Sequence, residues 1–488
     1  MSPENAILWA IAVPLIGSIG ILLTGKIANL RETVTLVTAV IMFLIVGSLT
    51  HIVLSGERPS VTLFEFLPGL TVTFTVEPLG MLFGLIASGL WIINSIYSIG
   101  YMRGNNEGNQ TRFYFFFAIA LASAVGVSFA GNMLTLFICY EILTLCTFPL
   151  VTHSGKPEAM KSGRTYLGIL LGTSIGLQLL AIIWTWHATG TLDFKAGGIL
   201  DGHVSGAAIS VLLFLYMYGI GKAALMPIHR WLPAAMVAPT PVSALLHAVA
   251  VVKAGVFTVV KVIVYIFGYE FLAEQLTTNW LVYVAGFTIL AASIVALRQD
   301  NLKRRLAYST ISQLSYVVMA AAILAPLSIM GAVLHIAAHA VGKITLFFAA
   351  GSIYTAAHKT EVSQLNGIGR KMPWTMGAFA IAALSMIGVP PTAGFLSKWY
   401  ILMGALSVEH YFAIGVIVLS TLLNTGYFIP VIYNAFFKEA DDKDDPHANH
   451  GEAPLPMVIA LTATAIATVL LFFFSGLPLE LATQVVGK

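Results

Sequence analysis

Nine ionisable side chains stand in stretches of this 488-residue sequence that are otherwise apolar enough to cross a membrane. A charged side chain at the centre of a bilayer costs roughly 2.5–3.5 kcal/mol even on the gentler insertion scales, so such residues are usually functional. Carboxylates, amines and imidazoles can each take up and release a proton, and the set therefore predicts proton transfer inside a membrane. The nine residues are Glu141, Lys222, His247, Lys253, Lys261, His335, His339, Lys343 and Lys398.

Glu141 is the only acid well inside one of these stretches, and Lys222 is its candidate partner. An unpaired carboxylate at that depth should protonate or find a cation. We expect Glu141 to hold Lys222 charged when the two are close, and separation of the pair to release the proton of Lys222. The alternative is a purely structural ion pair that ties two helices together.

Three titratable residues follow one another at helical spacing. His335, His339 and Lys343 fall at i, i+4 and i+8, which places them in one stripe on a helix and suits a proton relay. His247 and Lys253 are six residues apart and should point to different faces. Lys261 lies near the end of its stretch, where it either serves the relay or directs its ammonium group outward to the interface.

Prolines interrupt two of the lysine-bearing stretches. Pro227 follows Lys222 by five residues, and Pro390 with Pro391 precedes Lys398. A proline break frees backbone carbonyls, which a membrane tolerates only where protein or water covers them. The two breaks are five spans apart, and this spacing predicts two five-helix repeats of inverted topology.

The composition identifies the class of protein. Hydrophobic residues make up 58% of the chain and charged residues 10%, with a mean hydropathy of +0.88, so too few charges exist to cover a soluble globule. Apolar runs near the 20 residues that cross a bilayer recur throughout. We predict an all-α polytopic membrane protein of about fourteen transmembrane helices, with helices 7 and 12 broken. The expected spans are 5–25, 33–54, 77–99, 112–129, 132–153, 164–187, 206–228, 241–266, 279–297, 303–323, 329–356, 374–402, 411–436 and 456–476, with a re-entrant piece at 229–240.

Four regions follow from these spans. Residues 1–111 should hold the first three helices and a surface hairpin at TVTFTV (71–76), and 112–266 the first five-helix repeat. Residues 279–436 should hold the second, inverted repeat, and 437–488 an acidic cytoplasmic loop and the final helix. Of the 25 Lys and Arg residues, 17 fall in loops on one side, 3 in loops on the other and 5 inside spans. The positive-inside rule places the richer side in the cytoplasm and both termini outside a cytoplasmic membrane.

The sequence resembles the proton-translocating antiporter-like subunits shared by respiratory complex I and the Mrp multisubunit cation/proton antiporters. The resemblance covers residues 112 to 436 and rests on NMLTLFICYEILTLCTFPLV (132–151), KAALMPIHRWLPAAMVAPTPVSALLHAVAVVKAG (222–255), LKRRLAYSTISQLSYV (302–317), HIAAHAVGKITLFFAAG (335–351) and GVPPTAGFLSKWY (388–400). It implies fourteen helices with two inverted repeats, and relay roles for Glu141, Lys222, Lys253, His339 and Lys398. Lysine at 398, where one complex I subunit has glutamate, is similar to the D-type subunits of the Mrp antiporters.

Two functions remain open at this point. The first is proton translocation within a multisubunit Na+/H+ antiporter, and the second is the same role in a redox-driven complex such as a complex I-like oxidoreductase or a membrane-bound hydrogenase. Both imply paralogous and small membrane subunits as partners, in a lipid bilayer and without nucleic acid. A scaffold that only docks partner subunits is a further alternative. The sequence shows no Cys cluster, no HExxH and no phosphate-binding Gly loop, so we expect no catalytic chemistry, cofactor or metal site.

Overall fold

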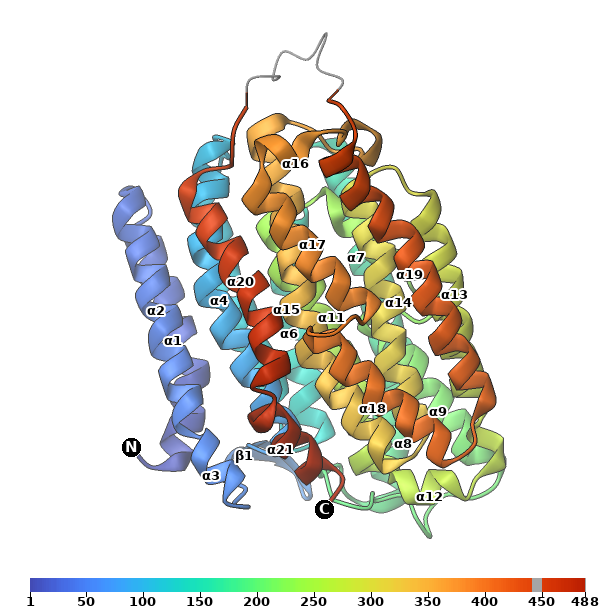
Figure 1. Ribbon diagram of the computed structural model, residues 1–488. Helices are drawn as coiled ribbons and strands as arrows, with labels where there is room; N and C mark the ends of the chain where they lie inside the picture. The colour runs from blue at the N-terminus through green and yellow to red at the C-terminus, as the bar shows by residue number, and fades with distance from the viewer. Residues whose placement is uncertain (441–449, 488) are drawn as a thin grey trace.

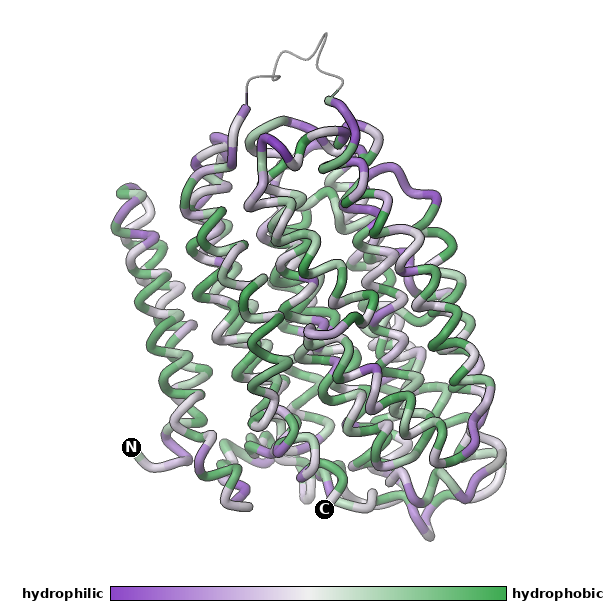
Figure 2. Tube along the Cα trace, in the orientation of Figure 1, coloured by the Kyte–Doolittle hydropathy of each residue, from purple (hydrophilic) through white to green (hydrophobic). Residues whose placement is uncertain are grey.

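Long apolar helices run side by side between two polar ends (Figures 1 and 2). In this computed structural model, which describes residues 1–440 and 450–487, eleven helical stretches are long and apolar enough to span a membrane. They are α1 (Pro3–Leu23), α2 (Ala28–Ser48) with α3 (Thr50–Leu54), α4 (Pro78–Gly104), α5 (Gln110–Ser128), α6 (Met133–Val151), α7 (Pro157–Thr173) with α8 (Leu179–Thr189), α11 (Val251–Lys261) with its flanking turns, α13 (Trp280–Arg298), α15 (Pro326–Ala357), α19 (Tyr411–Phe437) and α20 (Leu455–Phe473).

Three further segments complete the fourteen that we expected within the described residues. α9 (Ala207–Gly219) is short, and α14 (Leu302–Ala322) is less apolar because it carries three basic residues in its first turn and a run of Ser, Thr and Gln side chains. The third segment is split into α17 (Pro373–Ile387) and α18 (Ala393–Ser407). The all-α polytopic fold is therefore confirmed, whereas the inverted relation between two repeats stays a prediction.

Short elements cap the bundle. The strands β1 (Ser60–Leu67) and β2 (Leu70–Thr75) pair antiparallel, which confirms the hairpin expected at TVTFTV. The short helices α10 (Trp231–Ala234), α12 (Tyr269–Ala273), α16 (Ile368–Lys371) and α21 (Gly476–Val485) connect or follow the long ones. Of the acidic loop expected at 437–455, residues 441–449 lie outside the described residues, as does Lys488.

Two segments form the centre of the bundle. Every residue of the stretch Val242–Phe267 is buried, and α15 is almost entirely so. A helix that is surrounded on all sides by other helices needs no lipid-facing stripe, and it can hold polar side chains where those neighbours satisfy them. This is where most of the predicted relay residues lie.

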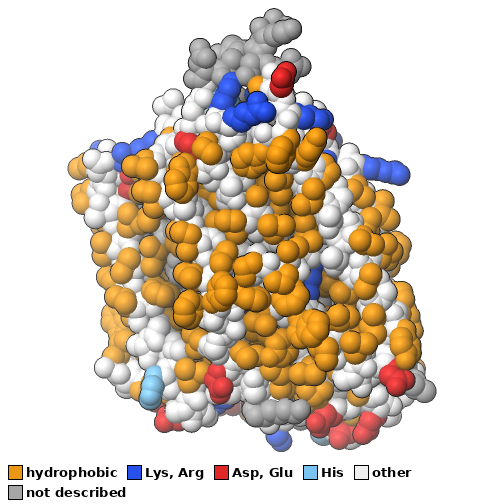
Figure 3. Space-filling view, viewed as in Figure 1, with side chains coloured by type: hydrophobic (Ala, Val, Ile, Leu, Met, Phe, Trp, Pro, Cys, Tyr) orange, Lys and Arg blue, Asp and Glu red, His pale blue; other side chains and the backbone are white. Residues whose placement is uncertain are grey.

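The two ends of the bundle differ in charge. Both termini, the hairpin and α21 lie at one end, and α16 lies at the other (Figure 1). On the face that Figure 3 shows, Lys and Arg side chains gather at the α16 end and hydrophobic side chains cover the region between the ends. The termini thus share one end, opposite the basic one, as the loop charges predict.

Candidate functional site

Lys222 lies in a break of the seventh span. α9 ends at Gly219, and Lys222 stands in the single 3-10 turn η2 (Gly221–Ala223). We expected this span to continue to 228, and that end is wrong. Pro227 lies within the break, between η2 and α10. The indole Nε1 of Trp231 donates to the Gly221 carbonyl at 2.9 Å. A side chain from beyond the break therefore takes the place of an intrahelical bond before the proline is reached.

The ammonium group of Lys222 binds α6 directly. Lys222 Nζ donates to the Tyr140 carbonyl at 2.8 Å and to Thr144 Oγ1 at 2.5 Å, and it lies 3.0 Å from the centre of the Tyr140 ring. Among the described residues Lys222 forms no ion pair with Glu141. Both carboxylate oxygens of Glu141 are buried and have no hydrogen-bond partner in the protein. Ordered water normally satisfies such atoms.

Lys398 lies at the break of the twelfth span, as predicted. α17 ends at Ile387 and α18 begins at Ala393, with Pro390 and Pro391 between them. Lys398 Nζ donates to the carbonyls of Met386 at 2.8 Å and Ile387 at 3.0 Å. These are orphan carbonyls at the negative end of a helix, a favourable place for a cation.

The eighth span is not a regular α-helix. Two π-helical segments, η4 (Val242–Ala250) and η5 (Val262–Phe267), flank α11. Lys253 Nζ donates to the Ala248 carbonyl at 3.0 Å and is hydrogen-bonded to His339 Nδ1. His247 points elsewhere, toward the rings of Tyr166 and Trp231, and both of its ring nitrogens are buried without a protein partner. π-helical turns inside a helix are frequent at functional sites.

The histidines of α15 continue the row from Lys253 toward Lys398. The ring centroids of His339 and His335 are 5.9 Å apart. His335 Nε2 lies 3.0 Å from Gln313 Oε1, and its Nδ1 lies 2.9 Å from Ser397 Oγ. An amide oxygen only accepts, so Nε2 of His335 carries the hydrogen of that bond. Ser397 Oγ also lies 3.1 Å from the Gly394 carbonyl, to which it can donate. Ser397 is the residue before Lys398.

Lys343 completes the predicted stripe and is hydrogen-bonded to α14. Its Nζ donates to Ser309 Oγ at 2.6 Å and to the Leu306 carbonyl at 3.4 Å, both on α14. Within the stripe, His335 and Lys343 are therefore both bonded to α14, whereas His339 is bonded to Lys253 of α11.

Lys261 does not reach the interface. Its side chain is fully buried and ion-paired with Glu77, the residue before α4. Lys261 Nζ also donates to the Ala130 carbonyl at 2.8 Å and lies 4.0 Å from the centre of the Phe194 ring. The outward orientation that we allowed for is wrong, because a carboxylate that is distant in the sequence is close in the fold.

Sequence reasoning missed the uncharged residues that bind the lysines and histidines directly or through further side chains. A signal existed for some of them: Gln313 and Ser309 belong to the polar run STISQLS in α14, and Ser397 precedes Lys398 in GVPPTAGFLSKWY. No local signal marks the others, which lie in apolar runs. The missed residues are Tyr140, Thr144, Ser309, Gln313, Ser397, Asn424 and Tyr427.

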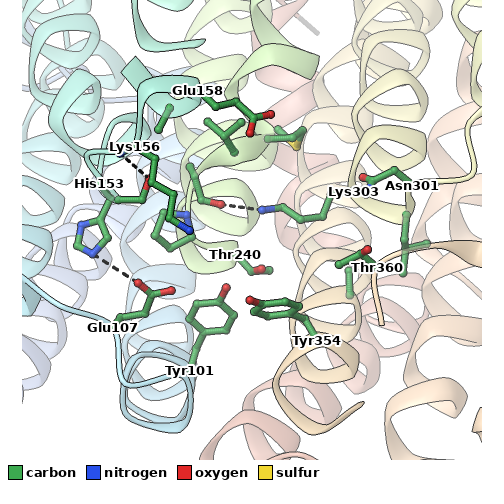
Figure 4. Close-up of a pocket in the computed structure, with 18 of the residues that line it drawn as sticks. Tyr101, Glu107, His153, Lys156, Glu158, Thr240, Asn301, Lys303, Tyr354 and Thr360 are labelled. Atoms are coloured by element: carbon green, nitrogen blue, oxygen red, sulfur yellow. Dashed lines mark hydrogen bonds and ion pairs between the residues drawn. The ribbon is translucent and has the colours of Figure 1, made fainter. Parts of the chain in front are cut away.

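A cavity of about 360 Å³ opens at the basic end of the bundle, between the loops after α4 and α6 and the start of α14 (Figure 4). Glu107 and His153 lie side by side on its wall, with Oε2 and Nε2 4.0 Å apart, and Lys303 Nζ donates to the Ala238 carbonyl at 2.7 Å. Thr240 lies on its wall. The segment η4, with Ser243 and His247, begins two residues further along the chain.

Burial governs the charge of the two groups at the mouth of this cavity. It raises the pKa of Glu107, against the opposing charges of Lys156 and Lys303. Burial lowers the pKa of His153 to about 4, and the nearby charge of Arg112 acts in the same direction. His153 is therefore neutral at neutral pH.

Fold and site together define a class: a multi-spanning membrane protein with two broken helices and a buried row of amines and imidazoles between them. Comparison with known proteins agrees. The family described as NADH:quinone oxidoreductase/Mrp antiporter, transmembrane, matches residues 130–424. NADH-quinone oxidoreductase subunit N of Desulforudis audaxviator is 32% identical over 417 residues, which are 83% of this chain and 82% of that protein. Subunit L of Mycobacterium tuberculosis is 32% identical over 85% of this chain and 64% of its own length.

Two solved structures share the fold. A chain of the Mrp complex from Dietzia sp. DQ12-45-1b superposes with a TM-score of 0.87 at 19% identity, over 100% of this chain and 97% of that one. A chain of an archaeal membrane-bound sulfane sulfur reductase superposes with a TM-score of 0.86 at 22% identity, over 99% of this chain and 98% of that one. The protein belongs to the NADH:quinone oxidoreductase/Mrp antiporter transmembrane family.

Proposed function

We propose that this chain is a proton-translocating subunit of a multisubunit Na+/H+ antiporter, of the D type. One observation carries the proposal: a row of contacts from Lys253 through His339, His335 and Ser397 to the residue beside it, Lys398. This row connects α11, in the region 112–266, with α18, in the region 279–436. Each position along this row offers a titratable group or a hydroxyl that can carry a proton, and none of these groups needs to be exposed to lipid.

The proposed path begins at the cytoplasmic side, to which the positive-inside rule assigns the basic end with its cavity. The ring nitrogens of His247 and the hydroxyl of Ser243, which have no protein partner, can bind water molecules that lead from the cavity wall inward. Glu141 and Lys222 act as the switch: approach of the carboxylate favours the charged lysine, and withdrawal favours transfer of its proton. The membrane potential contributes about 2.3 kcal/mol per charge per 100 mV to such a step.

Cation-driven proton movement in vesicles that carry the full assembly tests this function. We expect Na+ to trigger a pH change that disappears in Lys222→Ala and Lys398→Ala, while Lys161→Ala, an exposed lysine of α7, behaves as the unaltered chain. Transport that persists in either of the first two variants, in an assembled complex, would exclude that lysine from the path.

A redox-driven complex is the second candidate. Its support is the fold likeness to a chain of a respiratory membrane complex and the quinone oxidoreductase relatives. The same vesicles discriminate the two: proton movement that ignores Na+ and requires an electron donor assigns the chain to the second class. In either case the expected partners are paralogous and small membrane subunits, and we propose that both termini lie on the outer side of the cytoplasmic membrane.

A further inference from the structure

A second set of hydrogen bonds leaves Lys343 and enters the thirteenth span, α19, to which the proposed path assigns no role. Lys343 Nζ donates to Ser309 Oγ at 2.6 Å, and Ser309 Oγ lies 2.9 Å from Tyr427 Oη. Tyr427 Oη donates to Asn424 Oδ1 at 2.5 Å. All three uncharged side chains are fully buried, so this network is shielded from solvent.

The same network ends at a carbonyl that also holds Lys398. Asn424 Nδ2 donates to the Met386 carbonyl at 3.3 Å, and Lys398 Nζ donates to it at 2.8 Å. Two lysines on different helices, α15 and α18, are thus joined through three side chains and one backbone acceptor.

The direction of the hydrogens in this network depends on the charge of Lys343. An ammonium group only donates, so Ser309 accepts from Lys343. Tyr427 uses its single hydrogen on Asn424, and Ser309 must therefore donate to Tyr427. All hydrogens then point from Lys343 toward Asn424.

Loss of the proton from Lys343 reverses this direction. A neutral amine offers a lone pair, so Ser309 can donate to Lys343 and Tyr427 can donate to Ser309. The carbonyl oxygen of Asn424 then loses its donor. Hydrogen bonds in a chain strengthen one another, so Asn424 Nδ2 then donates more weakly to the Met386 carbonyl. That carbonyl is left as a better acceptor for Lys398, which favours the charged form of Lys398.

We propose that Ser309, Tyr427 and Asn424 are positioning residues that couple the two lysines, so that discharge of Lys343 favours the charging of Lys398. This inference rests on the proposed function. No proton travels through the network, because an amide does not hand on a proton as a hydroxyl does. The coupling is reciprocal: charge on Lys398 favours the discharge of Lys343. The titratable or charged groups that face the network are Lys253, Arg305, Tyr316, His335 and His339.

The test compares Tyr→Phe variants in the assembled complex. Tyr427→Phe removes the hydroxyl and keeps the ring, and Tyr216→Phe is a matched control whose hydroxyl lies 2.8 Å from Thr185 in the first half of the chain. In vesicles, we expect Tyr427→Phe to slow Na+-dependent proton movement roughly fivefold or more and to shift its pH profile, with no change in Tyr216→Phe. An unchanged rate and pH profile in Tyr427→Phe overturns the proposal.

A second pair of variants guards against a folding effect. Ser309→Ala should reproduce the shifted pH profile, and Ser309→Thr, which keeps a hydroxyl, should restore part of the loss. Equal behaviour of these two variants would overturn the proposal as well. Failure of the proposed function is seen separately, as the absence of Na+-dependent proton movement in vesicles with the unaltered chain.

Discussion

The ion pair between Lys261 and Glu77 leads to a quantitative prediction for Glu77→Gln. This change keeps the shape of the side chain and removes the only carboxylate that is ion-paired with the buried ammonium group among the described residues. Breaking a buried pair on one side costs about 3–5 kcal/mol, because the remaining charge stays desolvated. Lys261 keeps the Ala130 carbonyl and the Phe194 ring as partners. We therefore expect the low end, about 3 kcal/mol, or more than a hundredfold in the folding equilibrium.

The double variant Glu77→Gln/Lys261→Met isolates the cause. Replacement of a whole buried pair by uncharged groups is often nearly neutral, so the double variant should be far more stable than Glu77→Gln alone. Lys195→Met, an exposed lysine at the same end of the bundle, is the control and should change nothing. The measurement is the temperature at which the purified complex loses its monodisperse form. A Glu77→Gln variant as stable as the unaltered chain, or a double variant as unstable as the single one, would refute the reasoning.

Two further predictions concern the twelfth span and the basic cavity. Gly394→Ala should abolish transport, because a Cβ there would overlap the Ser385 carbonyl and push apart the helices that position Lys398; Gly377→Ala, which has open space, should be silent in the same vesicle assay. His153 binds its proton less readily in the folded chain than in the unfolded one, so the stability of the protein should fall as the pH drops from about 6.5 toward 4. The variant His153→Gln should lose less stability over this pH range when thermal unfolding is measured as a function of pH. An unchanged dependence of stability on pH in that variant would contradict the prediction.

Apolar run length predicts the spans well because a helix must cover a fixed thickness of hydrocarbon. The eleventh span, expected at 329–356, runs from Pro326 to Ala357, and the twelfth breaks at Pro390 and Pro391 as proline chemistry requires. The seventh span ended eight residues before Pro227, where Trp231 donates to the Gly221 carbonyl, a contact that no local pattern encodes.

The buried site was predictable in its charged members and not in their partners. A lysine or histidine in an apolar run is conspicuous because burying it in a membrane costs free energy. The spacing alone then placed His335, His339 and Lys343 on one face of a helix. Their partners could not be predicted, since these depend on how the helices pack: α14 supplies Gln313 to His335 and Ser309 to Lys343, whereas α11 supplies Lys253 to His339. The roles of these residues in transport stay predictions.

All five lysines inside the spans donate to a backbone carbonyl: Lys222 to Tyr140, Lys253 to Ala248, Lys261 to Ala130, Lys343 to Leu306 and Lys398 to Met386 and Ile387. Half of each docking contact is therefore made by an atom that every residue type possesses. An alanine scan would detect the lysine donors and miss the backbone carbonyls that accept from them. Substitution of the residues that supply these carbonyls would likewise leave the contacts intact. Amide-to-ester replacement, which weakens one chosen carbonyl as an acceptor, is the substitution that would make this hidden half of the site visible.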